Sequence, residues 1–256
     1  MSNAIVHCVL WEYVSELELL QDRAEADRLR REIIDLCLDT IAEIVHTRHG
    51  SLVARYILTY GVAKDRKTIA KLLKPHIERI ALNAEAQLVL FTTLDVTDDT
   101  KMIHKSLLSG INSPPTVKKL YADANGRRAL LYPLVGRSTR HFTPATIASI
   151  QITDEIREKA GTSKKDETLR QEEIKKVISE DMLRAVQENA KEMILDPGGS
   201  LLVTEVLLYA EGGGFSGPTF HPYSILIGTR SLRHNRGNIE APPSTISWHA
   251  ELEASD

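Results

Sequence analysis

The feature that most constrains this chain is a recurring segment in which a short polar turn leads into an apolar helix. Four copies can be aligned with one another, beginning near residues 2, 50, 126 and 199, and a weaker copy begins near residue 85. A unit of two or three helices cannot bury its apolar stripe alone, so neighbouring units must stack and share one continuous core. The spacings of 35 and 41 residues suit such a unit, whereas those of 48 and 73 residues require an insertion or a hidden unit.

Apolar residues recur at helical spacing along most of the chain and predict an all-α fold. Gly61 is expected to stop a helix, and Ser179 is expected to cap one. Residues 158–167 are charged and contain Gly and Ser, which indicates an exposed loop. Two helices are predicted within residues 5–46, and others over residues 51–60, 67–82, 86–94, 98–110, 116–121, 127–134, 143–152, 169–178, 181–195 and 201–209.

Composition excludes several classes of protein. Hydrophobic residues make up 42% and charged residues 26% of the chain, which is typical of a soluble protein, and aromatic residues at 5% are few for a β-sandwich or barrel. Cys8 and Cys37 are far apart and neither belongs to a C-x-x-C pair, which predicts a reducing compartment rather than a disulfide scaffold. No run approaches 18 apolar residues, so we expect no membrane span and no membrane partner.

The sequence offers no catalytic constellation. His46 and His49 have the spacing of metal ligands on a helix, but no cysteine or further histidine lies nearby, which favours a structural role. The glycine-rich stretch 212–217 lacks the preceding strand and following helix of a phosphate-binding loop. We therefore expect no enzyme activity, no cofactor, no metal and no small-molecule substrate.

One segment has the layout of a known repeat. From Gly50 to Gly61, a turn glycine precedes a helix that closes with Tyr60-Gly61, and this resembles the RNA-binding repeat of Pumilio (PUF) proteins. The chain from His46 to about Leu208 is more specifically similar to the penguin type of nucleolar Pumilio-like protein, with its CPL region. The residues that carry this resemblance are Lys64-Asp65-Arg66-Lys67, Asp95 to Lys101, Gly126 to Leu134 and Ser163-Lys164-Lys165-Asp166.

The resemblance implies an armadillo/Pumilio-like α-solenoid of stacked helical repeats over residues 1–211, with the CPL region at about 46–208. It also implies nucleic-acid binding, a location in the nucleus and nucleolus, and roles in large ribosomal subunit biogenesis and translational regulation. Two departures stand out, because the chain begins inside a repeat helix and residues 212–256 do not match the family's final helices. These departures indicate a fragment or an incomplete gene product, with an irregular or disordered tail.

The resemblance also identifies the helix positions that would read bases. A base-reading Pumilio repeat uses two side chains on the base edge and a third that stacks on the base. Only Ser51 with Arg55 offers a plausible edge-reading pair, and no repeat has an aromatic stacker, so we expect little base specificity. The corresponding triplets are Asn3, Ala4, His7; Ser51, Leu52, Arg55; Ala86, Gln87, Leu90; Arg127, Arg128, Leu131; and Ser200, Leu201, Thr204.

Charge offers another way to bind nucleic acid. Residues 64–79 carry six cations against two carboxylates, and residues 118–140 carry six cations against one. On one continuous face, two such clusters would form a basic stripe for phosphates. The candidate RNA-binding residues are Ser51, Arg55, Lys64, Arg66, Lys67, Lys71, Lys74, Lys118, Lys119, Arg127, Arg128, Arg137 and Arg140.

Two functions remain open from the sequence. In the first, the repeats bind RNA (a ribosomal precursor or a messenger) or DNA without strong base specificity, alongside ribosome-assembly proteins. In the second, they form a protein-binding helical scaffold that does not contact nucleic acid directly. Basic clusters on one face would favour the first function, and intervening acidic side chains would favour the second.

Overall fold

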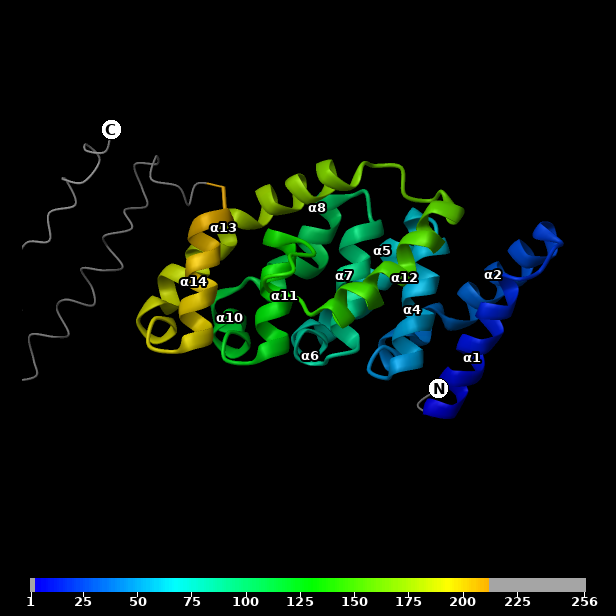
Figure 1. Ribbon diagram of the computed structural model, residues 1–256, viewed down its shortest axis with the longest axis horizontal. Helices are drawn as coiled ribbons and strands as arrows, with labels where there is room; N and C mark the ends of the chain where they lie inside the picture. Colours follow the sequence, from blue (N-terminus) through cyan, green and yellow to red (C-terminus); the bar gives the residue numbers. More distant parts are fainter. Residues whose placement is uncertain (1–2, 212–256) are drawn as a thin grey trace, which may run out of the picture.

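The computed structural model describes residues 3–211, and every regular element in that range is a helix, which confirms the all-α prediction (Figure 1). The predicted tail at 212–256 lies outside the described residues. In chain order the elements are α1 (Ala4–Leu17), α2 (Arg23–Cys37), η1 (Leu38–Thr40), α3 (Ile41–Ile44), α4 (Arg48–Tyr60), α5 (Ala63–Leu73), η2 (Lys74–His76), α6 (Ile77–Leu82), α7 (Ala86–Val96), α8 (Thr100–Ile103), η3 (His104–Leu108), α9 (Ser109–Ile111), α10 (Pro114–Leu120), α11 (Ala124–Val135), α12 (Pro144–Ala160), α13 (Glu167–Met193) and α14 (Pro197–Tyr209).

The helices stack as repeats. One row consists of α1, α4, α7, α11 and α14, each packed against the next, and we call it the first row. Figure 1 shows this row running along the long axis of the molecule, from α1 at one end to α14 at the other. The helices that precede each first-row helix pack beside that row, where α5 contacts η3 and α10 contacts the 27-residue helix α13. Every predicted turn-then-helix segment begins a helix of the first row, so the repeat is real.

Three glycines show why the repeat segment has its sequence. Gly50, Gly126 and Gly199 each lie in the first turn of a first-row helix. At each of them, the carbonyl oxygen of the residue six positions earlier occupies the space that a Cβ atom would need. Each glycine N–H also donates to a side chain three positions earlier, which caps the helix. The capping residues are Thr47, Asp123 and Asp196.

The weaker copy aligns one residue later than the sequence indicated. Asn83 caps α7 by accepting hydrogen bonds from the backbone N–H groups of Glu85 and Ala86. Ala86 is therefore the counterpart of Gly50, whereas the sequence alignment placed Glu85 there. The triplet of this repeat is consequently Gln87, Leu88 and Phe91 rather than Ala86, Gln87 and Leu90.

Several helix boundaries differ from the predictions. Pro75 lacks a backbone N–H, and the predicted helix over 67–82 divides at a 3₁₀ turn into α5, η2 and α6. Ser179 lies inside the single helix α13 instead of capping a second one, because its hydroxyl donates to the Lys175 carbonyl. Helix α12 extends three residues into the loop predicted over 158–167 and ends at Gly161, whose φ of 59° is left-handed, while residues 161–166 are non-helical as predicted.

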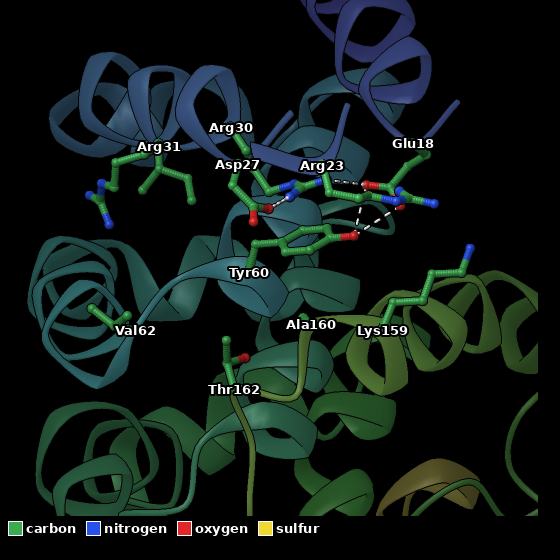
Figure 2. Close-up of a pocket in the computed structure, with 11 residues that line it drawn as sticks. Glu18, Arg23, Asp27, Arg30, Arg31, Tyr60, Val62, Lys159, Ala160 and Thr162 are labelled. Atoms are coloured by element: carbon green, nitrogen blue, oxygen red, sulfur yellow. Dashed lines mark hydrogen bonds and ion pairs between the residues drawn. The ribbon is translucent and has the colours of Figure 1, made fainter. Parts of the chain in front are cut away.

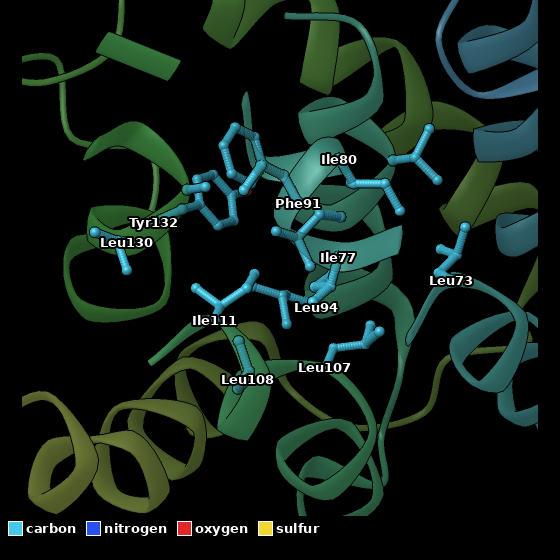
Figure 3. Close-up of a cluster of buried hydrophobic side chains, with 14 of the residues drawn as sticks. Leu73, Ile77, Ile80, Phe91, Leu94, Leu107, Leu108, Ile111, Leu130 and Tyr132 are labelled. Atoms are coloured by element: carbon cyan, nitrogen blue, oxygen red, sulfur yellow. The ribbon is translucent and has the colours of Figure 1, made fainter. Parts of the chain in front are cut away.

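One hydrophobic core runs through the stacked repeats from α2 to the end of α14. At its centre the rings of Phe91 and Tyr132 stack with centroids 4.1 Å apart, and Phe142 meets both edge-on. Figure 3 shows the rings of Phe91 and Tyr132 between α7 and α11, with the leucines and isoleucines of α6, α9 and η3 beside them. Phe142 lies just before α12, so the aromatic cluster holds the start of that helix against the first row.

None of the helices within residues 3–211 combines the length and apolarity that crossing a lipid bilayer requires.

Candidate nucleic-acid interface

The predicted base-reading pair is buried. Ser51 and Arg55 are 0% and 1% exposed. The Ser51 hydroxyl donates to the Glu85 carbonyl at 2.8 Å, and Arg55 Nη1 donates to the Ser149 carbonyl at 2.6 Å. Burial lowers the pKa of Arg55 to about 10. The expectation that this pair faces a base is therefore wrong for this structure, because both side chains connect α4 to other parts of the protein.

Arg55 is covered by the segment between α11 and α13, residues 136–166, which we call the cover. Helix α12 in this segment packs across α4 and α7, and the segment accounts for the long spacing before the last repeat copy. After α12, the Thr162 hydroxyl donates to the Thr59 carbonyl at 2.6 Å and accepts from Arg66 Nη2 at 2.5 Å. Arg66 is only 2% exposed and also donates to the Leu58 carbonyl. The prediction that Arg66 faces phosphate is therefore wrong as well, because this arginine fastens the cover.

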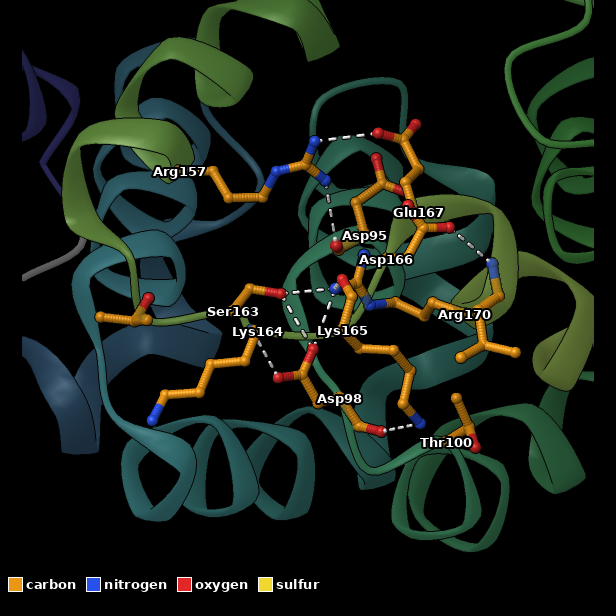
Figure 4. Close-up of polar contacts among 12 residues, drawn as sticks. Asp95, Asp98, Thr100, Arg157, Ser163, Lys164, Lys165, Asp166, Glu167 and Arg170 are labelled. Atoms are coloured by element: carbon orange, nitrogen blue, oxygen red, sulfur yellow. Dashed lines mark hydrogen bonds and ion pairs between the residues drawn. The ribbon is translucent and has the colours of Figure 1, made fainter.

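Asp98 holds the residues of the cover that directly follow Thr162 (Figure 4). Its carboxylate accepts hydrogen bonds from the Ser163 hydroxyl, the Lys164 backbone N–H and Arg170 Nη2, all at 2.8–2.9 Å. Burial alone would raise the pKa of Asp98, but these hydrogen bonds outweigh burial and hold the pKa at about 2. Two of the sequence stretches that carry the resemblance, Asp95 to Lys101 and Ser163 to Asp166, thus meet in space.

Arg137 belongs to a second internal network. Its guanidinium pairs with Asp95 at 2.8 Å and with Asp154, and the Tyr132 hydroxyl donates to Asp95 at 2.7 Å. Burial raises the pKa of Asp95 although Arg137 opposes the shift. The Arg137 side chain is 17% exposed, so its prediction as a phosphate contact is also wrong for this structure.

The remaining cations of the second cluster have partners within the protein. Lys118 pairs with Glu192 at 2.8 Å and Lys119 with Glu78 at 3.0 Å. Carboxylates therefore interrupt this cluster, and a single basic stripe over both clusters is not present within residues 3–211. Arg127 donates to the carbonyls of Tyr121 and Ala122, Arg128 donates to Asn125 Oδ1, and the half-exposed Arg140 pairs with the buried Glu205.

The first cluster keeps an exposed row of cations. Lys64, Lys67, Lys71 and Lys74 follow one another at spacings of three, four and three, which places them on one face of α5 and its continuation η2. All four are exposed, and Lys64, Lys67 and Lys71 make no ion pair with any residue of 3–211. Lys74 Nζ donates to the Lys105 carbonyl of η3, where Lys105 adds a further exposed cation.

We call these five residues, Lys64, Lys67, Lys71, Lys74 and Lys105, the lysine ridge. Sequence reasoning found four of its members. It missed Lys105, because Lys105 lies 31 residues after Lys74 and only the contact of α5 with η3 brings the two helices together. The ridge can hold a row of anions at a solvated surface.

Comparison with known proteins agrees with this architecture. Residues 122–216 match the CPL (NUC119) domain, a shorter range than the expected 46–208. The chain is 34% identical to rat Pumilio homolog 3 over 185 residues, which cover 72% of this chain and 28% of that protein. It is 23% identical to Drosophila melanogaster Protein penguin over 215 residues, which cover 84% of this chain and 27% of that protein. The chain thus spans less than a third of the length of either relative.

A solved structure has the same fold. Human Puf-A, crystallised in complex with DNA, superposes with a TM-score of 0.71 and 31% identity, covering 82% of this chain and 39% of that one. The match extends over most of the described repeats. The chain is therefore a Pumilio-like protein of the penguin type, with a CPL domain in its second half.

Proposed function

We propose that this chain binds RNA or DNA through backbone phosphates on the lysine ridge and does not read base sequence. The observation that carries the proposal is the row of Lys64, Lys67 and Lys71, which are exposed and free of internal ion pairs within residues 3–211. The burial of Ser51 and Arg55 supports the lack of base reading, since neither side chain reaches solvent. The complex of human Puf-A with DNA supports the ligand class.

The ridge sets the expected strength of the salt effect. From Lys64 to Lys74 the chain rises roughly 15 Å at about 1.5 Å per residue, enough for a few successive phosphates. If the ridge neutralises roughly three to five phosphates of a single strand, the logarithm of affinity should fall with the logarithm of salt concentration with a slope of about −2 to −4.

The test compares charge reversals on and off the ridge. Binding of a single-stranded RNA is measured across a salt series for the native chain, Lys67→Glu and the double variant Lys67→Glu/Lys71→Glu. Each reversal should weaken binding to all sequences and make the salt slope shallower by roughly one unit. Lys191→Glu, an exposed lysine of α13 away from the ridge, is the matched control and should bind like the native chain. Equal losses in Lys191→Glu and Lys67→Glu would show that the ridge is not the contact.

We extend the proposal to the cell on the basis of the family resemblance. The chain would act in the nucleus and nucleolus, in large-subunit ribosome biogenesis and translational regulation, bound to ribosomal precursor RNA or messenger RNA beside ribosome-assembly proteins. A tagged chain should localise to the nucleolus and recover precursor ribosomal RNA, and Lys67→Glu/Lys71→Glu should recover less. Recovery that is unchanged in the double variant would contradict a role for the ridge there.

A protein-binding scaffold is the alternative, and one observation favours it. Ile5, Val9 and Tyr13 are 71%, 59% and 39% exposed and lie at four-residue spacing, so they form an apolar stripe on one face of α1. Such a stripe can pack against the helix of a partner protein. If the chain binds no RNA even at low salt, the scaffold function replaces the nucleic-acid function.

A further inference from the structure

A cavity of about 590 Å³ opens where the α1–α2 corner, the end of α4 and the end of α12 meet. Figure 2 shows its wall, with Tyr60 in the middle, Arg23 from α2 on one side and Lys159 from α12 on the other. The volume lies within the range of pockets that hold small organic ligands. None of the residues predicted from sequence to bind RNA lines this cavity, so it is a separate feature of the surface.

The floor of the cavity is a closed polar network. Arg30 lies 3.9 Å from the centroid of the Tyr60 ring and pairs with Glu18 and Asp27. The hydroxyls of Tyr56 and Tyr60 both donate to Glu18, at 3.0 and 2.8 Å. Glu18 and Asp27, the two carboxylates that line the cavity, thus share the single charge of Arg30, and Glu18 also accepts the two tyrosine hydroxyls.

Two cations at the cavity are not engaged in this way. Arg23 and Lys159 are exposed, and neither makes an ion pair or a side-chain hydrogen bond with any residue of 3–211. Arg23 comes from α2 and Lys159 from the distant helix α12, and in Figure 2 both extend past the hydroxyl end of Tyr60. A guanidinium can bind two phosphate oxygens at once, and an ammonium adds a point charge.

The wall also has an apolar part and a connection to the ridge. Ile34, Val62 and Ala160 line the cavity and offer a surface for a sugar or a base. Val62 directly precedes α5, and Lys64, the first residue of the lysine ridge, follows two positions later. A strand that follows the ridge could thus place a nucleotide in the cavity.

We propose that this cavity binds a phosphate monoester of nucleotide size, held by Arg23 and Lys159. The inference rests on the proposed function for the source of the ligand, which is a terminal nucleotide of the strand bound on the ridge. Free nucleotides offer the same chemistry. The phosphate lies between the two cations, and the sugar and base rest on the apolar wall.

The test is calorimetric titration of the chain with adenosine 5′-monophosphate, with adenosine as the uncharged comparison. The monophosphate should bind and adenosine should bind much more weakly. Arg23→Gln/Lys159→Gln should lower the affinity for the monophosphate roughly tenfold or more, because two charge-assisted contacts are lost. Arg28→Gln is the control, since Arg28 lies on the same helix but pairs with Glu25 and Glu32 outside the cavity.

Two further arms separate this inference from the function of the ridge. Lys67→Glu/Lys71→Glu should still bind the monophosphate, even if it no longer binds RNA. A single-stranded RNA with a terminal phosphate should compete with the monophosphate for the native chain, and failure to compete would overturn the link to the strand. Equal binding of monophosphate and adenosine, or full affinity in a folded Arg23→Gln/Lys159→Gln variant, would overturn the phosphate site itself.

Discussion

Replacing Gly126 by alanine tests whether the repeat depends on close approach of two helices. In the structure, a Cβ added at Gly126 would lie 2.9 Å from the Cα atom of Leu120, and the Leu120 carbonyl oxygen would be closer still. These are backbone atoms at the end of α10, so no side-chain rotation relieves the overlap. The start of α11 must therefore move away from the end of α10.

The expected cost follows from two opposing effects. In the interior of a helix, alanine is more stabilising than glycine by about 0.5–1 kcal/mol. Extra volume in a tightly packed site, in contrast, destabilises the fold by about 1–3 kcal/mol. Because the overlap is with backbone, we take the upper end of the second range and expect a net loss of about 2 kcal/mol. For a chain of this size, that loss corresponds to a fall in Tm of about 4–8 °C.

Thermal unfolding followed by circular dichroism measures the effect, and Gly110→Ala is the matched control. Gly110 also lies in a helix, but an added Cβ would meet only the Ile77 side chain at 3.4 Å, which is nearly an ordinary contact. This control should melt at the native temperature or slightly above it. Gly199→Ala, at the equivalent position of the last repeat, should lower the Tm as Gly126→Ala does. A Gly126→Ala chain as stable as Gly110→Ala would refute the argument.

Three other perturbations probe the internal networks. Asp98→Asn should lower the free energy of unfolding by about 1–2 kcal/mol near neutral pH. This value is smaller than the pKa shift alone would give, because the carboxylate is partly exposed. The pKa of Asp98 is lowered to about 2 in the folded chain, so its contribution to stability is complete above about pH 5 and is lost as the pH falls toward 2. The free energy of unfolding, measured between pH 5 and pH 2, should therefore decrease less steeply in Asp98→Asn than in the native chain. Arg137→Met leaves Asp95 buried without its cation, so it should lower the free energy of unfolding in urea by about 3–5 kcal/mol. The double variant Arg137→Met/Asp95→Asn should recover part of that loss. Arg55→Ala removes the contact that holds α12, so hydrogen exchange should quicken in α12 and stay unchanged in α14, and an unchanged α12 would contradict its role as a fastened cover.

Local rules account for the parts of the fold that were predicted correctly. Gly61 ends α4 as expected, and Thr143 with Pro144 begins α12, because caps and prolines act through neighbouring backbone atoms. The same rules failed at Ser179, where a hydroxyl with capping potential bonds back to its own helix. Pro75 carried a signal for a helix break that the prediction of one helix over 67–82 overlooked.

The candidate interface was predicted less well, for a physical reason. Lys67 and Lys71 are exposed as expected, since their position on α5 follows from helical spacing alone. Arg55, in contrast, is buried because it contacts Ser149, which is 94 residues away in the chain. No periodicity in the sequence reports a contact over that distance, and an arginine with a buried partner has the same sequence signal as a solvated one.

The amino-acid sequence by itself determined the helical repeats, because the apolar spacing, the capping residues and the close-approach glycines act within one unit or between neighbouring units. It also determined the likeness to penguin-type Pumilio proteins. Only the tertiary structure decided which polar residues reach solvent. The segment from Gly136 to Asp166 folds back over α4 and α7, buries Arg55 and leaves the lysines of α5 exposed. The energy of that fold-back lies in contacts such as Arg66 with Thr162 and Asp98 with Lys164, which form only when distant repeats have stacked.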